Sequence, residues 1–178
     1  MPQPDDTPRL VLFAGPAGAG KSTLAAAWCR TRTRAVLVEL DEVREGIVSG
    51  RADPRLPGDT QTIQYDLGVA ACLALARVWL GGGYDVAITD VLDPEAYGRH
   101  WHGRLGGLDP RLVVVLPSLD VTLARAAART KPVPLAISAA QHRASLGWHP
   151  ALRIDTSNLD PAASLPFVIA ALTRDPRP

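Results

Sequence analysis

The chain has 178 residues, of which 47% are hydrophobic and 21% are charged, and its 19 basic residues nearly balance its 18 acidic ones. This length suits one domain with a sizeable core, so we expect a single domain over residues 1–178, with frayed tails at 1–8 and 174–178. The balanced charge argues against nucleic acid as a partner, and no apolar stretch predicts a membrane span. The polar, proline-rich start is unlike a signal peptide, so a cytoplasmic location is expected.

Short apolar runs alternate with amphipathic segments, a pattern typical of α/β proteins with a parallel sheet. Five runs are predicted to be buried strands: Leu10–Ala14, Ala35–Leu40, Asp85–Thr89, Leu112–Leu116 and Leu152–Asp155. Helices are predicted at Ser22–Arg30, Asp41–Val48, Thr62–Leu80, Leu119–Arg129, a short segment with Ser138 and Gln141 as its capping box, and a last helix beginning at Asp160–Pro161.

The longest predicted helix, Thr62–Leu80, has a clear helical period. Its apolar residues at this spacing share one face: Ile63, Leu67, Ala70, Ala74 and Val78. Three consecutive glycines, residues 81–83, are expected to end it.

The most specific motif is the segment from Gly15 to Ser22, which reads GPAGAGKS and completes the pattern G-x-x-x-x-G-K-[ST]. It lies between a predicted strand and a predicted helix, so its backbone N–H groups and the helix N-terminus would face phosphates. Lys21 would reach the β- and γ-phosphates, and the Ser22 hydroxyl would bind Mg²⁺. The alternative is a glycine-rich turn without a ligand. The expected nucleotide contacts are Gly15, Pro16, Ala17, Gly18, Ala19, Gly20, Lys21, Ser22 and Thr23.

Carboxylates follow the second and third predicted strands, at the sheet edge where α/β proteins bind ligands. Asp90 occupies the Walker B position and would hold Mg²⁺, unless it caps the next turn. Asp41 would act as general base toward a substrate hydroxyl, unless it only caps its helix. Arg44, one turn later, would bind the substrate or pair with Glu42 or Glu45.

Arg125 and Arg129 are four residues apart on a predicted helix that leads into Thr130–Pro134, a proline-rich segment expected to form a short lid. Together the two arginines would clamp the transferred phosphoryl group. Alternatively, Arg125 stacks on adenine, or both side chains are only solvated. Lys131 is a weaker candidate in the same place.

Two further features could suggest ligand sites. His100 and His102 form an H-x-H pattern, but no Cys or carboxylate cluster completes a metal site, so a structural role is favoured. Trp148 could line the pocket for the nucleotide base. Residues 50–59 and 93–101, together with the lid, are expected to line the acceptor pocket.

The phosphate loop, Asp41 with Arg44, Asp90 at a strand end, and Arg125 with Arg129 before a lid follow one another along the chain. In the order of these motifs the chain resembles P-loop kinases of the nucleoside-monophosphate-kinase-like group, most closely the chloramphenicol-phosphotransferase-like and polynucleotide-kinase-like ATPases. The resemblance implies a three-layer sandwich with a five-stranded parallel sheet of order 2-3-1-4-5, helices on both faces and a short lid. It also implies ATP and Mg²⁺, a catalytic base at Asp41, a substrate-positioning role for Arg44, and a loop near adenine at residues 155–158. The D-G-[FY]-P-R segment of nucleotide kinases is absent.

These features predict an ATP-dependent phosphotransferase that moves the γ-phosphate to a hydroxyl of a small molecule. The catalytic residues would be Asp41, Lys21, Arg125 and Arg129. The alternatives are a polynucleotide 5′-end kinase, which the balanced charge disfavours, and a nucleotide-gated binding module with little transferase activity. No feature of the sequence predicts an oligomeric state or the identity of the acceptor.

Overall fold

The computed structural model describes residues 9–53, 56 and 58–173; the predicted frayed tails lie outside these residues. Its centre is a five-stranded sheet with the order β2-β3-β1-β4-β5, in which every neighbouring pair is parallel. The predicted strand order is therefore confirmed. The strands are β1 (Leu10–Ala14), β2 (Ala35–Glu39), β3 (Asp85–Thr89), β4 (Arg111–Val115) and β5 (Arg153–Ile154).

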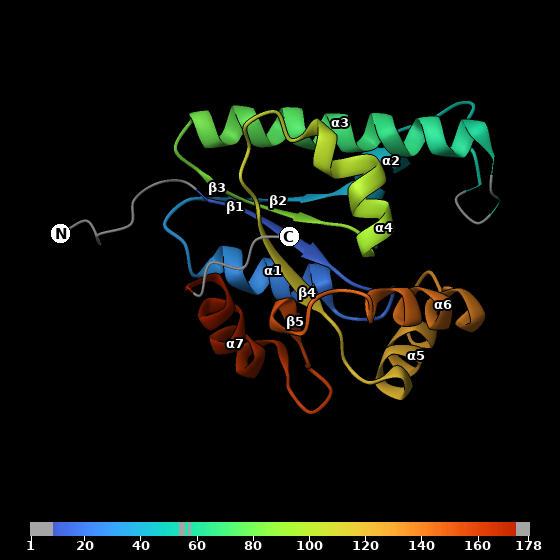
Figure 1. The fold of residues 1–178 in the computed structure, drawn as a ribbon, viewed down its shortest axis with the longest axis vertical. Coiled ribbons are helices and arrows are strands. Elements are labelled where there is room, and N and C mark those ends of the chain that lie inside the picture. Colours follow the sequence, from blue (N-terminus) through green and yellow to red (C-terminus); the bar gives the residue numbers. More distant parts are fainter. Residues whose placement is uncertain (1–8, 54–55, 57, 174–178) are drawn as a thin grey trace.

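Helices cover both faces of the sheet (Figure 1). In chain order they are α1 (Lys21–Arg30), α2 (Leu40–Glu45), α3 (Asp59–Gly81), α4 (Pro94–Ala96), the π-helix η1 (Tyr97–Trp101), the 3-10 helix η2 (His102–Arg104), α5 (Leu119–Ala127), α6 (Leu135–Ser145), the 3-10 helix η3 (Pro150–Leu152) and α7 (Pro161–Thr173). The second helix is shorter than predicted, because it ends at Glu45 rather than Val48.

The alternation of side chains along each strand creates two cores. Leu10 and Leu12 of β1 face a core that includes α2, α3 and η1, whereas Val11 and Phe13 face a core built with α1 and α7. All five side chains of β1 are buried, as expected for a central strand of a parallel sheet. The sheet therefore fixes its carboxyl edge firmly between two helical layers.

Helix α3 packs on the sheet through the face opposite its row of Ile63, Leu67 and Val78. Its buried residues are Gly68, Val69, Cys72, Leu73 and Ala76. The apolar face noted from the sequence is solvent-exposed, with Ile63 58%, Leu67 64% and Val78 71% accessible. The helical period did not determine the packing side, because α3 is apolar on both sides and periodicity alone cannot choose between them.

Helix α3 also corrects the expectation that no segment is long enough for a membrane span. Its 23 residues meet the length and composition of such a span, and 28% of its most apolar stretch is buried within the fold. In this fold the helix contacts the sheet along one side, and core helices of other proteins meet the same criterion.

Candidate active site

The phosphate loop joins β1 to α1 and packs against the neighbouring strand and helix. A Cβ atom on Gly15 would lie 2.3 Å from the Val115 carbonyl oxygen, and one on Gly18 would lie 2.3 Å from that of Thr122. Both glycines also have positive φ angles, of 135° and 87°. Only glycine satisfies both conditions, so these residues hold the loop at the edge of β4 and α5.

Lys21 is buried at the start of α1 and folds over the loop, where its Nζ donates to the Pro16 carbonyl at 2.9 Å. Burial lowers the pKa of Lys21 to about 8, and attraction to the carboxylates of Asp90 and Asp41 opposes part of that shift. The structure thus brings together the lysine and both carboxylates that follow β2 and β3. In the sequence these residues are up to 69 positions apart, between 21 and 90.

Ser22 has a partner that sequence reasoning missed. Its Oγ donates to Oε2 of Glu39 at 2.8 Å, and Glu39 is the last residue of β2. The only sequence signal was its place two residues before Asp41 at a strand end. A serine hydroxyl beside carboxylates is a set of hard oxygen donors, which suits Mg²⁺.

Among the described residues, no group of three or more His, Cys, Asp or Glu side chains is arranged to hold a metal by itself. Magnesium commonly takes one or two protein ligands and completes its shell with phosphate oxygens and water. The donor set at Ser22 and Glu39 therefore fits a metal that arrives with a nucleotide.

Asp90 lies just after β3 and is held by two helices. The Tyr65 hydroxyl, from α3, and the Trp101 Nε1–H, from η1 at 3.0 Å, both donate to its Oδ2. Burial raises the pKa of Asp90 to about 7. Asp90 does not cap the next turn, because Asp93 accepts from the Ala96 N–H at the start of α4. Neither donor was recognised from the sequence.

Asp41 and Arg44 both lie on α2. Asp41 does not cap its helix, and Arg44 does not pair with Glu45. Glu39, not Asp41, is the N-cap of α2, so Asp41 lies within the first turn. Glu45 contacts Lys131 rather than Arg44, at 2.9 Å. This last contact joins α2 to the segment predicted to be the lid.

Arg44 is a buried cation, only 9% exposed, and its Nε has no hydrogen-bond partner among the described residues. Its guanidinium lies 5.6 Å from the centre of the Tyr65 ring. Gly68 allows this packing, because a Cβ there would lie 2.9 Å from Cγ of Arg44. A buried guanidinium without a carboxylate partner favours binding of an anion.

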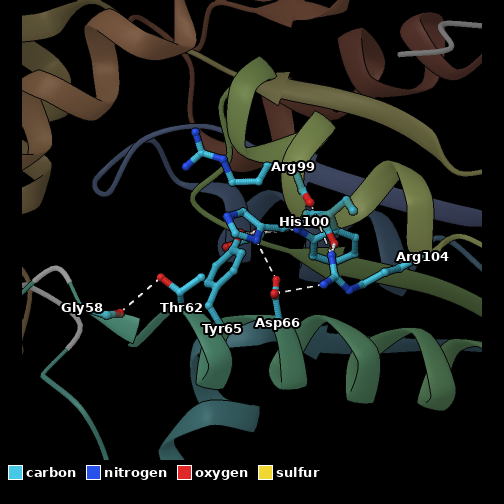
Figure 2. A network of polar contacts seen from close by, with 9 residues as sticks. Gly58, Thr62, Tyr65, Asp66, Arg99, His100 and Arg104 are labelled. Carbon is cyan, nitrogen blue, oxygen red and sulfur yellow. Dashed lines mark hydrogen bonds and ion pairs between the residues drawn. The ribbon is translucent and has the colours of Figure 1, made fainter. Parts of the chain in front are cut away.

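A network of polar contacts braces η1 against α3 (Figure 2). His100 Nδ1 lies 2.6 Å from Oδ1 of Asp66, and Arg104 Nη2 lies 3.0 Å from Oδ2 of the same carboxylate. The His100 ring also meets Tyr65 edge-on, with 4.9 Å between ring centroids. This arrangement agrees with the structural role favoured for the H-x-H pattern, and it supports the two donors to Asp90.

The two arginines predicted to share a helix face are separated. Helix α5 ends at Ala127, so exposed Arg129 lies beyond it. Arg125 donates to the Thr156 carbonyl at 3.0 Å and to its hydroxyl at 3.3 Å. Only Arg129 acts on Lys21 through its charge, which contributes to the lowered pKa of that lysine.

Arg125 instead lines a pocket beside the phosphate loop. This cavity has a volume of about 220 Å³ and lies between the start of α1 and the β5–α7 connection. Gly20 and Thr23 line one side, and Thr156 and Ser164 line the other. A cavity of this kind next to a phosphate-binding loop suits a nucleotide base.

The predicted capping box of Ser138 and Gln141 is wrong. Helix α6 begins at Leu135 with Pro134 as its N-cap, so both residues lie inside the helix. Ser138 Oγ donates to the Ala17 carbonyl at 2.8 Å, and Gln141 Oε1 accepts from the Ala17 N–H at 3.0 Å. Helix α6 therefore supports the phosphate loop.

Trp148 does not line the base pocket. Its ring is buried in the core on the α3 side of the sheet, where it meets Tyr97 edge-on. Its Nε1–H donates to the Leu92 carbonyl at 3.1 Å. The aromatic residue therefore stabilises the chain after β3.

The strand order, the glycine-rich loop and the lysine define a P-loop fold of the kinase type. The chain belongs to the AAA domain family (AAA_33), whose model matches residues 10–152. No curated protein matches the sequence.

Solved structures of similar fold include two that the chain matches over nearly its whole length. One is a sugar kinase from Janibacter sp. HTCC2649, with a TM-score of 0.71 and 16% identity over 93% of this chain and 95% of that one. Another is the tunicamycin resistance protein of Deinococcus radiodurans, with a TM-score of 0.68 and 18% identity over 94% and 95%. The Pnkp1/Rnl/Hen1 RNA repair complex matches with a TM-score of 0.58 and 20% identity, over 79% of this chain and 45% of that one.

Proposed function

We propose that this protein is a Mg²⁺-dependent phosphotransferase that moves the γ-phosphate of ATP to a hydroxyl group of a small, negatively charged molecule. The observation that carries the proposal is the convergence of Lys21, Asp41 and Asp90 at one edge of the sheet, close enough for their charges to interact. A nucleotide switch needs the lysine and a carboxylate for the metal, which Lys21 and Asp90 would supply. A phosphotransferase also needs a base for its acceptor, and Asp41 would supply it.

The negative charge of the proposed acceptor is inferred from Arg44. This guanidinium is buried on α2, one turn after Asp41, and lies over the Tyr65 ring, with no ion pair to a carboxylate among the described residues. A carboxylate or phosphate of the acceptor would supply the missing partner through charge-assisted hydrogen bonds. The hydroxyl of the same molecule would then lie toward Asp41.

In the proposed reaction Asp41 accepts the proton of the acceptor hydroxyl while the hydroxyl oxygen attacks the γ-phosphorus. The bond from the γ-phosphorus to the β–γ bridging oxygen breaks, and its electron pair stays on ADP. Lys21 and Arg129 would stabilise the charge on the phosphoryl oxygens. Mg²⁺, held by Ser22 with Glu39 and Asp90 directly or through water, would neutralise the phosphates.

The base of ATP would occupy the pocket beside the loop. Arg125 would contact the base there, with its own position set by its hydrogen bonds to Thr156. In this proposal Arg125 contributes to nucleotide binding, and the role of a charge clamp falls to Arg129. The contact between Lys131 and Glu45 would close the lid segment over α2.

The test is an Asp41→Asn variant assayed with ATP, Mg²⁺ and a panel of hydroxylated carboxylates, sugar phosphates and 5′-hydroxyl oligonucleotides. We expect wild-type protein to transfer phosphate to an anionic small molecule. We expect the variant to bind ATP with an unchanged Kd but to lose 100-fold or more in transfer, roughly the share of general-base catalysis. Undiminished transfer by the variant would exclude Asp41 as the base.

The same panel discriminates the alternatives. Phosphorylation of the oligonucleotide alone would indicate a polynucleotide 5′-end kinase, a reading that the likeness to the RNA repair complex keeps open. ATP binding with no stimulation of ADP release by any acceptor would indicate a nucleotide-gated binding module.

A further inference from the structure

The outward side of α3 carries a continuous apolar stripe. Ile63, Leu67 and Val78 are 58%, 64% and 71% exposed, and the alanines between them, Ala70 and Ala74, are exposed as well. In Figure 1 the helix runs along the margin of the molecule, with the sheet, α2 and α4 on its inner side and no described element on its outer side.

The stripe lies opposite the face that packs on the sheet. At about 100° of rotation per residue, the five stripe residues span a sector of roughly 80°, centred on the side away from Cys72 and Ala76. None of the five is polar. A helix that is apolar on both sides is normally buried on both sides, so the outer side is built to be covered.

The charged residues of α3 lie outside the apolar stripe. Asp66 is bound by His100 and Arg104, and Arg77 donates to the Leu105 carbonyl at 2.7 Å. Asp59, Asp66 and Arg77 all lie along one border of the stripe at helical spacing. An exposed patch bordered by charges on one edge has the composition of a protein interface.

We propose that the protein forms a two-fold symmetric dimer in which α3 packs antiparallel against α3 of a second copy. The stripe is self-complementary about its centre, near residue 72. In antiparallel register Ala70 of one copy faces Ala74 of the other, and Leu67 faces Val78. The two alanines allow the helix backbones to approach closely, and the larger side chains fill the space on either side.

Charge supports the same register. Under the two-fold axis Asp66 of one copy lies at the height of Arg77 of the other, on the same border of the stripe. The charges that flank the contact are therefore opposite in sign, while Asp66 and Arg77 keep the partners they have within each copy. The net charge of +1 creates little repulsion between copies.

The area of the stripe suits a weak dimer. The stripe from Ile63 to Val78 is about 22 Å long, and a helix about 10 Å wide covers roughly 220 Å² of it on each copy, or about 440 Å² over both copies. That area is below the size of stable interfaces, so we expect a transient dimer with a dissociation constant of about 100 μM or more. A lipid surface suits the stripe less well, because an interfacial helix carries basic residues along its polar borders and α3 has two acidic ones beside the stripe.

Analytical ultracentrifugation over a concentration series tests the proposal. We expect wild-type protein to dimerise and Leu67→Glu to raise the dissociation constant at least tenfold, with unchanged circular dichroism and ATP binding. The matched control is Phe167→Glu on α7, where the apolar side chain is 52% exposed and lies outside the stripe, and it should dimerise as wild type. Wild-type protein that stays monomeric, or a Leu67→Glu variant that dimerises normally, would overturn the proposal.

Cysteine cross-linking tests the register separately. A mixture of Ala70→Cys and Ala74→Cys chains should form an intermolecular disulfide faster than either variant alone, because the antiparallel register pairs these two positions. Equal or faster cross-linking of Ala70→Cys with itself would contradict the antiparallel arrangement. A monomeric wild-type protein that instead co-sediments with phosphatidylcholine vesicles would assign the stripe to a lipid surface.

Discussion

At the scale of single residues, the site consists of charges held in positions that favour function over stability. Lys21 and Asp90 are both buried, and burial moves the pKa of each toward neutrality, to about 8 and about 7. Tyr65 and Trp101 offset part of the cost by donating to the Asp90 carboxylate. Pre-positioned charges of this kind are typical of sites that stabilise developing charge in a transition state.

The loss of folding stability caused by the buried Asp90 carboxylate can be measured. Its pKa is about 7 in the folded protein and 3.8 ordinarily, so folding takes up a proton between these values and stability falls as the pH rises through this window. In Asp90→Asn the amide oxygen can still accept from Tyr65 and Trp101. We expect this variant to be more stable than wild type by about 1–3 kcal/mol near pH 8.5, with a smaller gain near pH 5 because only part of the window lies below that pH.

Urea unfolding at the two pH values checks this prediction. The loss of attraction between Asp90 and Lys21 offsets part of the gain, which is why we expect less than the full pKa difference implies. A variant that is equally destabilised at both pH values would show that the Asp90 carboxylate is not a strained charge.

At the scale of elements, helix α6 holds the phosphate loop in shape. Ser138 and Gln141 bind the two backbone groups of Ala17, and His142 Nε2 lies 2.8 Å from the Pro117 carbonyl after β4. These three side chains project from adjacent turns of one helix, so α6 joins the loop after β1 to the loop after β4. The helix therefore belongs to the nucleotide half of the site, although none of its residues lies in the P-loop motif.

Ser138→Ala tests this role of α6. The change leaves the Ala17 carbonyl, which is buried, without its partner, so we expect a loss of about 1–3 kcal/mol in the free energy of unfolding and a higher Kd for ATP. The control is Ser145→Ala on the same helix, whose hydroxyl only donates to the Gln141 carbonyl one turn earlier. It should leave ATP binding unchanged, as measured by calorimetry. Equal Kd values for the two variants would contradict the coupling.

At the scale of the whole molecule, the sheet brings the two halves of the site together from separate parts of the chain. In the proposed function, the nucleotide half would come from β1, α1, α5, α6 and the β5–α7 connection, and the acceptor half from α2, α3 and η1. Each half rests on a different core, one on either side of the sheet. They meet at the carboxyl edge, where ligands bind in parallel α/β folds.

Ligand binding should therefore stabilise the molecule as a unit. At about 100 times its Kd, ATP with Mg²⁺ would add about 2.7 kcal/mol and raise Tm by roughly 5–11 °C for a chain of this size. Lys21→Ala should abolish the shift because it removes the contact to the phosphates. Lys131→Ala, which changes the chain's other lysine, should keep most of it. Differential scanning calorimetry measures both variants, and an equal shift in Lys21→Ala would place the nucleotide elsewhere.

Much of the fold could be predicted from the sequence because its signals are local. Buried strands are short runs of branched apolar residues, and β1 and β3 have the predicted bounds, with the others within one or two residues. The phosphate loop is a contiguous motif, and Asp41 and Asp90 follow from the rule that ligands bind at strand ends. Ser118 and Asp160 were recognised as helix caps for the same reason, since a cap contacts its own next turn.

The remaining features depend on residues that are distant in the sequence, and only the tertiary structure decided them. Glu39 meets Ser22 and Tyr65 meets Asp90 because the sheet places β2, β3 and α3 side by side. The packing side of α3 was undetermined for a physical reason: a helix with two apolar faces can bury either, and the choice depends on which one fits the sheet. Ser138 shows the same limit, since its spacing to Gln141 matched a capping box while its actual partner, Ala17, lies 121 residues away.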